Sequence, residues 1–214
     1  TDRKGKAAEE RAVEMLTLVG VNEPEKRVKQ YPYELSGGMR QRVMIAMALA
    51  CEPDILIADE PTTALDVTIQ AQILELMQDL QKKLGMAIII VTHDLGVIAD
   101  MCDEIIVMYG GRVCERGTAE DIFYRPHHEY TKGLLRSIPN VDKIGEKLIP
   151  IPGTPINLLN MPKGCAFCPR CENAMKICIE EVPQEMQMPD GHYASCWLNV
   201  KEAMEAKQGG GKHE

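Results

Sequence analysis

The stretch LSGGMRQR at residues 35–42, followed after an apolar segment by ILIADEP at residues 55–61, decides how the rest of the chain is interpreted. Ser36 belongs to a residue type that caps helices, and the pattern after it predicts a helix over residues 39–50. The two glycines that follow Ser36 remove the side chains that would keep a ligand away from the first N–H groups of this helix. A helix start of this kind favours phosphate oxygens.

Two adjacent carboxylates, Asp59 and Glu60, end the apolar run that begins at Ile55. This pattern is typical of a buried parallel strand that delivers acidic side chains to its carboxyl end. One acid can hold Mg²⁺, and the other can orient or deprotonate a water molecule. A second β-rich run at residues 86–91 predicts a neighbouring parallel strand, which brings His93 to the same end of the sheet.

Together with the triplets ALD at residues 64–66 and THD at residues 92–94, these segments resemble the motifs of ABC transporter ATPase subunits. Each motif alone would be weak, but their order and spacing make the resemblance specific. The resemblance identifies residues 35–42 as the signature loop, residues 55–60 as Walker B, Asp66 as part of the D-loop and His93 as the switch histidine.

In this family two ATPase domains pair head to tail and hold ATP between them. The resemblance implies that Ser36, Gly37 and Gly38 contact the nucleotide of the partner domain. The roles implied for the remaining candidates are Mg²⁺ binding through water for Asp59, polarisation of the attacking water for Glu60, γ-phosphate contact for His93 and communication across the dimer for Asp66.

The resemblance implies an α/β fold, a partial P-loop NTPase domain with a parallel sheet and a helical subdomain, over residues 1–122. A loop-rich metal-binding extension is expected over residues 123–200, and a disordered tail over residues 201–214. Hydrophobic periodicity and glycine positions predict further helices and strands. The helices are expected at residues 6–19, 67–84, 95–101 and from 117, and a strand pair at residues 104–109 and 112–113.

The tail beyond Phe123 resembles the C-terminal extension of oligopeptide and dipeptide importer ATPases. The segments that carry this likeness are the proline-rich and glycine-rich stretch that includes residues 151–155, PKGCAF at residues 162–167 and the Arg170-Cys171 pair. The likeness narrows the expected family to the peptide branch. Within the tail, His127 and His128 are candidate metal ligands by residue type, although adjacent residues of a helix or strand point apart.

Five cysteines cluster near the end of the chain, at positions 165, 168, 171, 178 and 196. Their all-thiolate chemistry suits either Zn²⁺ or an iron–sulfur cluster, and the spacing of the first three is that of bacterial ferredoxins. The pattern of the peptide-importer family differs: it matches Cys165, Cys171, Cys178 and Cys196, which in that family are associated with a [4Fe-4S] cluster, and it leaves Cys168 spare. Because a loop-rich tail has little core, we expect a structural role for the metal.

Composition excludes several classes of protein. A net charge of -8 argues against sequence-independent binding of nucleic acid, which needs a basic face. The longest apolar runs are far shorter than the about 20 residues that cross a bilayer, so membrane association is expected to go through a partner. Eight cysteines, five of them clustered, fit a reducing compartment with one metal site better than a disulfide framework.

Phosphoryl transfer needs a loop that cradles the β- and γ-phosphates, yet no Gly-x-x-x-x-Gly-Lys-[Ser/Thr] pattern occurs in this sequence. We therefore expect the C-terminal part of a longer ATP-binding subunit, inactive alone, which in intact form hydrolyses ATP to power peptide import. The expected partners are a second ATPase subunit, membrane permeases and, indirectly, an extracytoplasmic binding protein. The expected location is the cytoplasmic face of the cell membrane.

Other functions stay open at this point. An ABC importer for nickel or another small solute would share the same motifs. A non-transport ABC ATPase of DNA repair or translation is a further alternative, against which the acidic charge and the importer-like tail argue. A metal-binding interaction module is a third.

Overall fold

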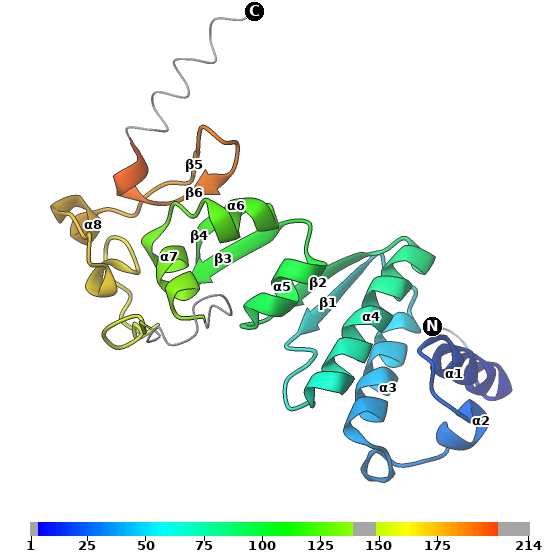
Figure 1. The fold of residues 1–214 in the computed structure, drawn as a ribbon. Coiled ribbons are helices and arrows are strands. Elements are labelled where there is room, and N and C mark those ends of the chain that lie inside the picture. The colour runs from blue at the N-terminus through cyan, green and yellow to red at the C-terminus, as the bar shows by residue number, and fades with distance from the viewer. Residues whose placement is uncertain (1–3, 139–148, 201–214) are drawn as a thin grey trace, which may run out of the picture. The chain divides into compact units, whose positions relative to one another are not determined.

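The computed structural model describes residues 4–138 and 149–200 (Figure 1). The chain divides into two compact units, one ending at Met101 and the other beginning at Cys102. The tail predicted to be disordered, residues 201–214, lies outside the described residues. Within the described ranges, every helix is too short or too polar to span a lipid bilayer.

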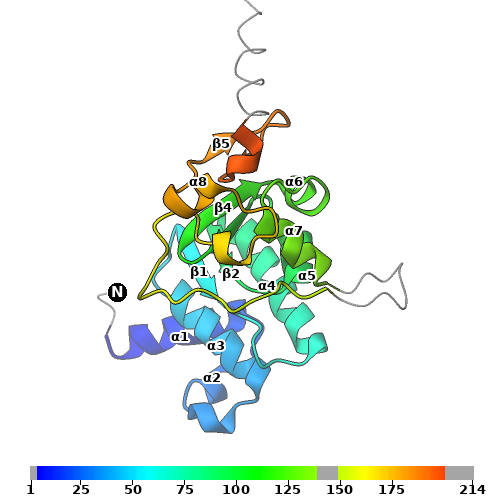
Figure 2. The ribbon, with the colours of Figure 1, turned by 90° about the vertical axis from the view of Figure 1, so that its left-hand side faces the viewer.

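The first unit is a layer of helices on a pair of parallel strands. Its longer helices and both strands confirm the elements predicted for this part of the chain, whereas the short helix at Pro24–Arg27 and the 3₁₀ turn at Pro32–Glu34 were not predicted. Its elements are α1 (Lys6–Leu18), α2 (Pro24–Arg27), the 3₁₀ turn η1 (Pro32–Glu34), α3 (Gly37–Leu49), β1 (Ile55–Asp59), α4 (Val67–Leu84), β2 (Ala87–Val91) and α5 (Leu95–Met101). In both Figure 1 and Figure 2, α1 lies beside α3, which it contacts.

Local sequence explains where the two long helices of this unit begin and end. Ser36 caps α3 and Asp66 caps α4, each by accepting a hydrogen bond from a backbone N–H three residues on, which a helix start leaves without a partner. Gly85 ends α4 in the left-handed conformation, with φ of 66°. The core below these helices is aliphatic and rich in methionine, and its most buried members are Leu49, Ile73, Met77 and Leu80.

Strands β1 and β2 pair in parallel from Ile55 opposite Ala87 to Asp59 opposite Val91. One face of the pair packs on the helical core through residues such as Leu56 and Ile88. The other face is exposed, and the exposed fractions of its side chains are 55% for Ile55, 67% for Ile57, 49% for Ile89 and 50% for Val91. The prediction of a parallel pair is confirmed, but the prediction of burial holds for one face only in this chain.

The second unit is built on an antiparallel sheet with strand order β3-β4-β6-β5. The predicted hairpin forms its first two strands, and the two short strands close to the end of the chain add to β4. Its elements are β3 (Ile105–Tyr109), β4 (Arg112–Gly117), α6 (Ala119–Tyr124), α7 (Glu129–Arg136), the 3₁₀ turn η2 (Cys168–Arg170), α8 (Lys176–Glu180), β5 (Met186–Gln187), β6 (Tyr193–Ala194) and the 3₁₀ turn η3 (Trp197–Asn199).

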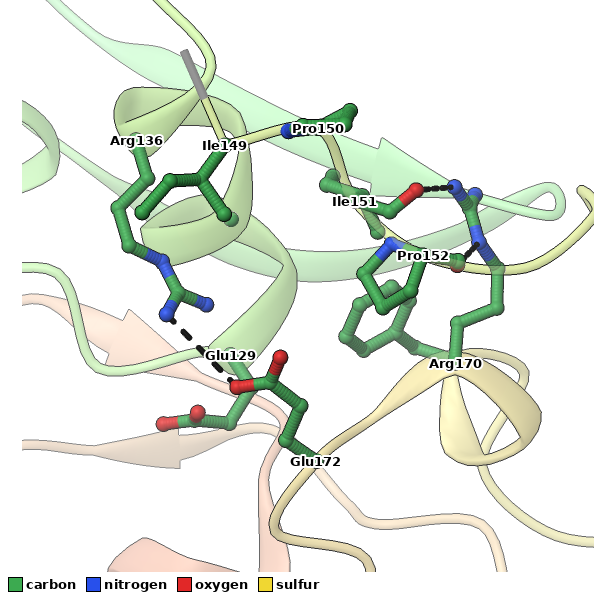
Figure 3. A pocket seen from close by; sticks show the side chains of 10 residues that line it. Glu129, Arg136, Ile149, Pro150, Ile151, Pro152, Arg170 and Glu172 are labelled. Atoms are coloured by element: carbon green, nitrogen blue, oxygen red, sulfur yellow. Dashed lines mark hydrogen bonds and ion pairs between the residues drawn. The ribbon is translucent and has the colours of Figure 1, made fainter. Parts of the chain in front are cut away.

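An aromatic cluster and one arginine hold the loop-rich segment of this unit. The rings of Tyr109, Tyr130 and Phe167 lie 4.7 to 5.3 Å apart between centroids. Arg170 donates hydrogen bonds to the carbonyl oxygens of Ile151 (3.0 Å) and Pro152 (2.8 Å) beside a small cavity (Figure 3). A segment without regular secondary structure is thus fastened through its backbone carbonyls.

Candidate functional site

The start of α3 presents the predicted signature loop. Ser36 is exposed, and its hydroxyl accepts a hydrogen bond from the N–H of Met39 at 3.3 Å. The Arg40 guanidinium donates to the carbonyl oxygen of Leu35 at 2.8 Å, which fixes the residue before the cap. The loop is therefore held by its own polar groups, with the N-terminal end of a 13-residue helix facing outward.

The two glycines of this loop lie against the start of α4. A Cβ added to Gly38 would lie 2.8 Å from Cγ2 of Ile69, and one added to Gly37 would lie 3.6 Å from Cδ2 of Leu65. Gly38 is thus required by helix packing, independently of any ligand. Sequence reasoning attributed both glycines to ligand approach alone and did not foresee this contact.

Glu60 and His93 meet at the carboxyl ends of the two parallel strands. The Nδ1 atom of His93 lies 3.1 Å from Oε1 of Glu60, and the hydroxyl of Thr63 donates to Oε2 at 2.8 Å. The N–H of Glu60 donates to the carbonyl oxygen of Val91, which extends the β1–β2 pairing by one residue, and Glu60 has a left-handed φ of 45°. The sheet therefore brings together two residues that are 33 positions apart in the sequence.

The electrostatics of this pair keep the carboxylate ionised. The hydrogen bond from Thr63, followed by that from His93, lowers the pKa of Glu60 below its ordinary value. The side chains remain accessible, with 46% of Glu60 and 79% of His93 exposed. An exposed carboxylate with both oxygens oriented is able to accept a hydrogen bond from a water molecule.

The other predicted acids take different places. Asp59 is exposed at the last position of β1. Asp66 accepts from the N–H of Ile69 at 3.0 Å, so its carboxylate caps α4. Asp94, which had no assigned role, accepts hydrogen bonds from Gln70 (3.0 Å) and from the N–H of Gly96 (2.9 Å). The hydrogen bond from Gln70 is the main reason for the lowered pKa of Asp94, and it ties α5 to α4.

All five clustered cysteines line one cavity of the second unit, which is ≈ 20 Å³ in volume. They come from the turn around η2, from α8 and from the strand end before η3. Burial raises the pKa of Cys171 and of Cys196 to about 11. Beyond burial, the neighbouring thiols at Cys165, Cys171 and Cys178 raise the pKa of Cys196 further.

The predicted four-cysteine set thus converges in space, and Cys168 lies at the same cavity. The backbone holds the ligand loops together, because the N–H of Cys165 donates to the carbonyl oxygen of Cys178 at 2.8 Å. Among the described residues, the three-residue group with ligand atoms all within 4.8 Å of one another is His127, Asp190 and His192 rather than a set of cysteines. Sequence reasoning singled out only the first of these three.

Two family models match the chain. The model described as ABC transporter matches residues 2–63, and the model described as the C-terminal region of the oligopeptide/dipeptide transporter matches residues 114–178. The first match contains Ser36 and Glu60. The second contains all the clustered cysteines except Cys196.

Curated relatives are similar along nearly the whole chain. The dipeptide transport ATP-binding protein DppD of Bacillus subtilis is 55% identical over 201 residues, which are 94% of this chain and 60% of that protein. The oligopeptide transport ATP-binding protein OppD of the same organism is 60% identical over 193 residues, 90% of this chain and 54% of that protein. The chain therefore spans somewhat more than half the length of these relatives.

A solved structure resembles this chain in fold. A structure of an inward-facing transporter assigned to the metal-chelate ABC type is 26% identical, with a TM-score of 0.53, and the match covers 63% of this chain and 51% of that one. The likeness agrees with the mixed α/β architecture and the parallel strand pair.

Proposed function

We propose that this chain, a homologue of the ATP-binding proteins of dipeptide and oligopeptide ABC transporters, supplies the hydrolytic acids and the signature loop of a subunit that powers peptide import. The observation that carries the proposal is the contact between Glu60 and His93 at the ends of two parallel strands. A carboxylate and an imidazole in contact at this sheet end support the roles proposed for Glu60 and His93.

In the proposed reaction Glu60 orients the water that attacks the γ-phosphate of ATP. Its two oxygens are held by Thr63 and His93, so the carboxylate is positioned before substrate binds. His93, which is largely exposed, is assigned the contact with the γ-phosphate. Asp59, at the end of the same strand, is the residue assigned to Mg²⁺, an ion that neutralises the charge on the transferred phosphoryl group.

The signature loop is assigned to a second nucleotide. The N-terminal end of α3 carries the partial positive charge of the helix dipole, and it begins with the exposed Ser36 and the half-buried Gly37 and Gly38. We infer that this end meets the nucleotide of a second ATPase subunit and that Asp66, which caps α4, lies at the same contact. The two subunits are homo- or heterodimeric partners in this proposal.

The site is completed by residues that this sequence does not contain. The sequence has no phosphate-binding loop, and the outer face of the β1–β2 pair is apolar and exposed. Parallel sheets are covered on both faces, so a further layer is expected against Ile57 and Ile89. The chain alone is therefore proposed to be inactive.

The cysteines at positions 165, 171, 178 and 196 are proposed to hold a [4Fe-4S] cluster, with Zn²⁺ as the alternative. The donor chemistry fits either group. The four cysteines line one cavity and come from separate segments, so a shared group bound there would join those segments. Its proposed role is to fasten the loops of the extension.

The proposed partners are the second ATPase subunit and the transmembrane permeases, and through them an extracytoplasmic binding protein. The proposed location is the cytoplasmic face of the membrane. Import of nickel or another small solute is the second candidate, because the residues proposed for the site contact ATP and not the transported solute.

Complementation tests this function. The matching segment of Bacillus subtilis DppD is replaced by this chain, and dipeptide uptake is measured in cells that lack the native subunit. We expect uptake to be restored, and Glu60→Gln to lower it by about 10²- to 10⁴-fold, the usual contribution of a positioned general base.

Asp79→Asn, which neutralises an exposed carboxylate on α4, is the matched control and should leave uptake unchanged. Equal uptake with Glu60→Gln and with Asp79→Asn would remove the assigned role of Glu60. Mg²⁺-dependent ATP hydrolysis by the 214-residue chain alone, abolished by Glu60→Gln, would show that no further residues are needed.

A further inference from the structure

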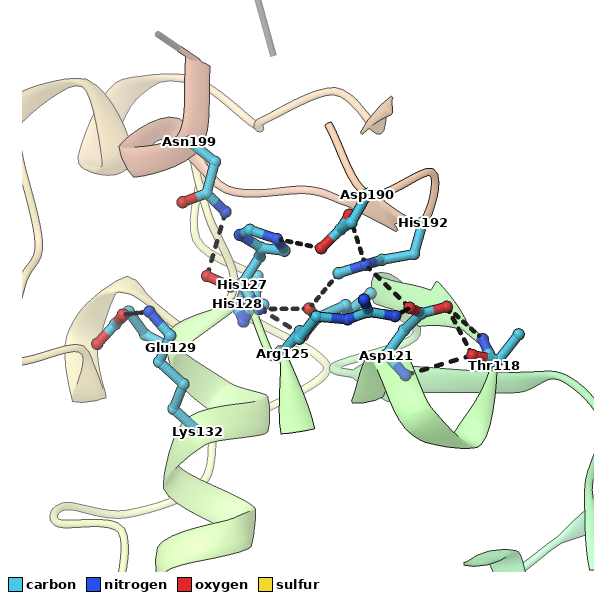
Figure 4. Close-up of polar contacts among 11 residues, drawn as sticks. Thr118, Asp121, Arg125, His127, His128, Glu129, Lys132, Asp190, His192 and Asn199 are labelled. Atoms are coloured by element: carbon cyan, nitrogen blue, oxygen red, sulfur yellow. Dashed lines mark hydrogen bonds and ion pairs between the residues drawn. The ribbon is translucent and has the colours of Figure 1, made fainter. Parts of the chain in front are cut away.

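A buried polar cluster in the second unit joins the turn between β5 and β6 to the start of α7 (Figure 4). The side chain of His192 is fully buried between two carboxylates. Its Nε2 atom lies 3.1 Å from Oε1 of Glu115, and its Nδ1 atom lies 2.9 Å from Oδ1 of Asp190. The other oxygen of Asp190 lies 3.2 Å from Nε2 of His127, whose ring centroid is 4.6 Å from that of His192.

Glu115 on β4 decides which ring nitrogen of His192 carries a proton. Its fully buried carboxylate accepts hydrogen bonds from the backbone N–H groups of His127 and His128. An ionised carboxylate only accepts hydrogen bonds, so Nε2 of His192 must be the donor toward it. In the neutral ring, Nδ1 then keeps a lone pair.

That lone pair has no hydrogen-bond donor. Although Nδ1 of His192 is 2.9 Å from the Asp190 carboxylate, the contact lacks the alignment of a hydrogen bond, and the atom is buried without a hydrogen-bond partner. A buried lone pair beside a carboxylate is unfavourable unless a positive charge lies close to both. A cation or a proton between Nδ1 of His192 and the Asp190 carboxylate would therefore stabilise this pair.

The surrounding charge favours a dication. Besides Glu115 and Asp190, the carboxylate of Asp121 lies 3.9 Å from Nδ1 of His192. Arg125 pairs with Asp121 at 2.6 Å. An excess of negative charge is left around the two imidazoles.

We propose that His127 Nε2, His192 Nδ1 and the carboxylate of Asp190 bind a divalent transition metal ion of the zinc class. Their ligand atoms all lie within 4.8 Å of one another. Two imidazoles and one carboxylate suit Zn²⁺, whereas Mg²⁺ and Ca²⁺ prefer oxygen ligands alone. Glu115 holds the far nitrogen of His192, as carboxylates do behind the histidines of zinc sites.

The ligands of this site differ from the thiols of the cysteine cavity, and the site joins a different pair of segments. The ion would link residues 190–192, in the turn before β6, to His127, which precedes α7. His128, the neighbour of His127, takes no part because its Nδ1 accepts from the N–H of Tyr130 and caps α7. Of the two adjacent histidines that the sequence offered, the structure assigns only His127 to the metal.

Zinc binding to the full chain tests the proposal. Bound Zn²⁺ is quantified by equilibrium dialysis for the wild type, Asp190→Asn and His127→Gln, with His93→Gln as the control that removes an imidazole in the other unit. The wild type and His93→Gln should bind one equivalent more than the two site variants. In the two site variants the affinity for this additional zinc ion should fall by at least about 10- to 100-fold, which is the loss typical when residues that hydrogen-bond metal ligands are replaced.

Zinc X-ray absorption of the wild type gives a readout that does not depend on the folding of any variant. Imidazole scattering in addition to sulfur supports the site. Zinc held by sulfur alone, or equal binding by the wild type and both variants, would overturn the proposal.

Discussion

Replacing Gly164 by alanine should loosen the cysteine-rich part of the second unit. A Cβ at this position would lie 2.3 Å from the carbonyl oxygen of Cys178 and 2.7 Å from the carbonyl carbon of Ile179. Both obstacles are backbone atoms of α8, so neither can turn aside as a side chain would. The substitution must push the segment before Cys165 away from the helix that carries Cys178.

The magnitude follows from the contacts that this movement breaks. Forcing an extra carbon into a packed interior costs about 1–3 kcal/mol. Two hydrogen bonds are strained with it, from the N–H of Cys165 to Cys178 and from Arg112 to the carbonyl oxygen of Gly164 at 2.9 Å, each contributing about 0.5–1.5 kcal/mol. The free energy of unfolding should therefore fall by roughly 2–6 kcal/mol.

The single tryptophan of the chain makes this measurable. Trp197 lines the cysteine cavity and donates to the carbonyl oxygen of Glu181 at 3.0 Å, so its fluorescence reports unfolding of this unit. Gly164→Ala should lower the urea midpoint by roughly 1–3 M, given a slope of about 2 kcal/mol per M. Gly37→Ala lies in the first unit, where a Cβ would make only ordinary contact with Leu65; it serves as the control outside the reported unit and should leave the Trp197 midpoint unchanged. A shift below about 0.3 M for Gly164→Ala would refute the steric argument.

Two further predictions concern polar contacts. Because the pKa of Asp94 is lowered in the folded chain, its ionised carboxylate stabilises the fold at pH values above the ordinary pKa of an aspartate, and this stabilisation is lost as the pH falls through the lowered pKa. The stability of Asp94→Asn should therefore depend less on pH below about pH 4 than that of the wild type. Acid unfolding followed by circular dichroism measures this difference. A steeper acid loss in the variant would contradict the assignment of Gln70 as its stabilising donor. Arg170→Lys should speed amide exchange in the segment around Ile151, because an ammonium cannot span two carbonyls and the Tyr109 hydroxyl as the guanidinium does; unchanged exchange would show that other contacts hold this segment.

Local signals in the sequence were sufficient to predict the elements of the first unit. Capping residues, periodicity and a terminal glycine each act within a few positions, so α3, α4 and α5 could be located from their own segments. The contact of Glu60 with His93 was also within reach, because parallel strands align their carboxyl ends. This contact could be predicted because it follows from the geometry common to parallel sheets.

The contacts between distant segments could not be predicted in this way. Strand β6 has two residues and carries no alternating pattern, yet it pairs with β4 and brings His192 to Glu115, 77 positions away. Gly38 was assigned to a ligand, although its neighbour Ile69 alone forbids a side chain. In each case the deciding partner lies on another element, so the residue's own segment contains no sign of it.

The exposed apolar face of β1 and β2 is also determined by residues outside their own segments. Residues on both faces of β1 are apolar, which is the composition of a strand buried on two sides, but the described helices of the first unit cover the side of Leu56. Since contiguous exposed apolar surface is rare on soluble proteins, the side of Ile55 and Ile57 is best explained as one that another layer covers. We therefore propose that a further layer packs on the exposed face of the β1–β2 pair.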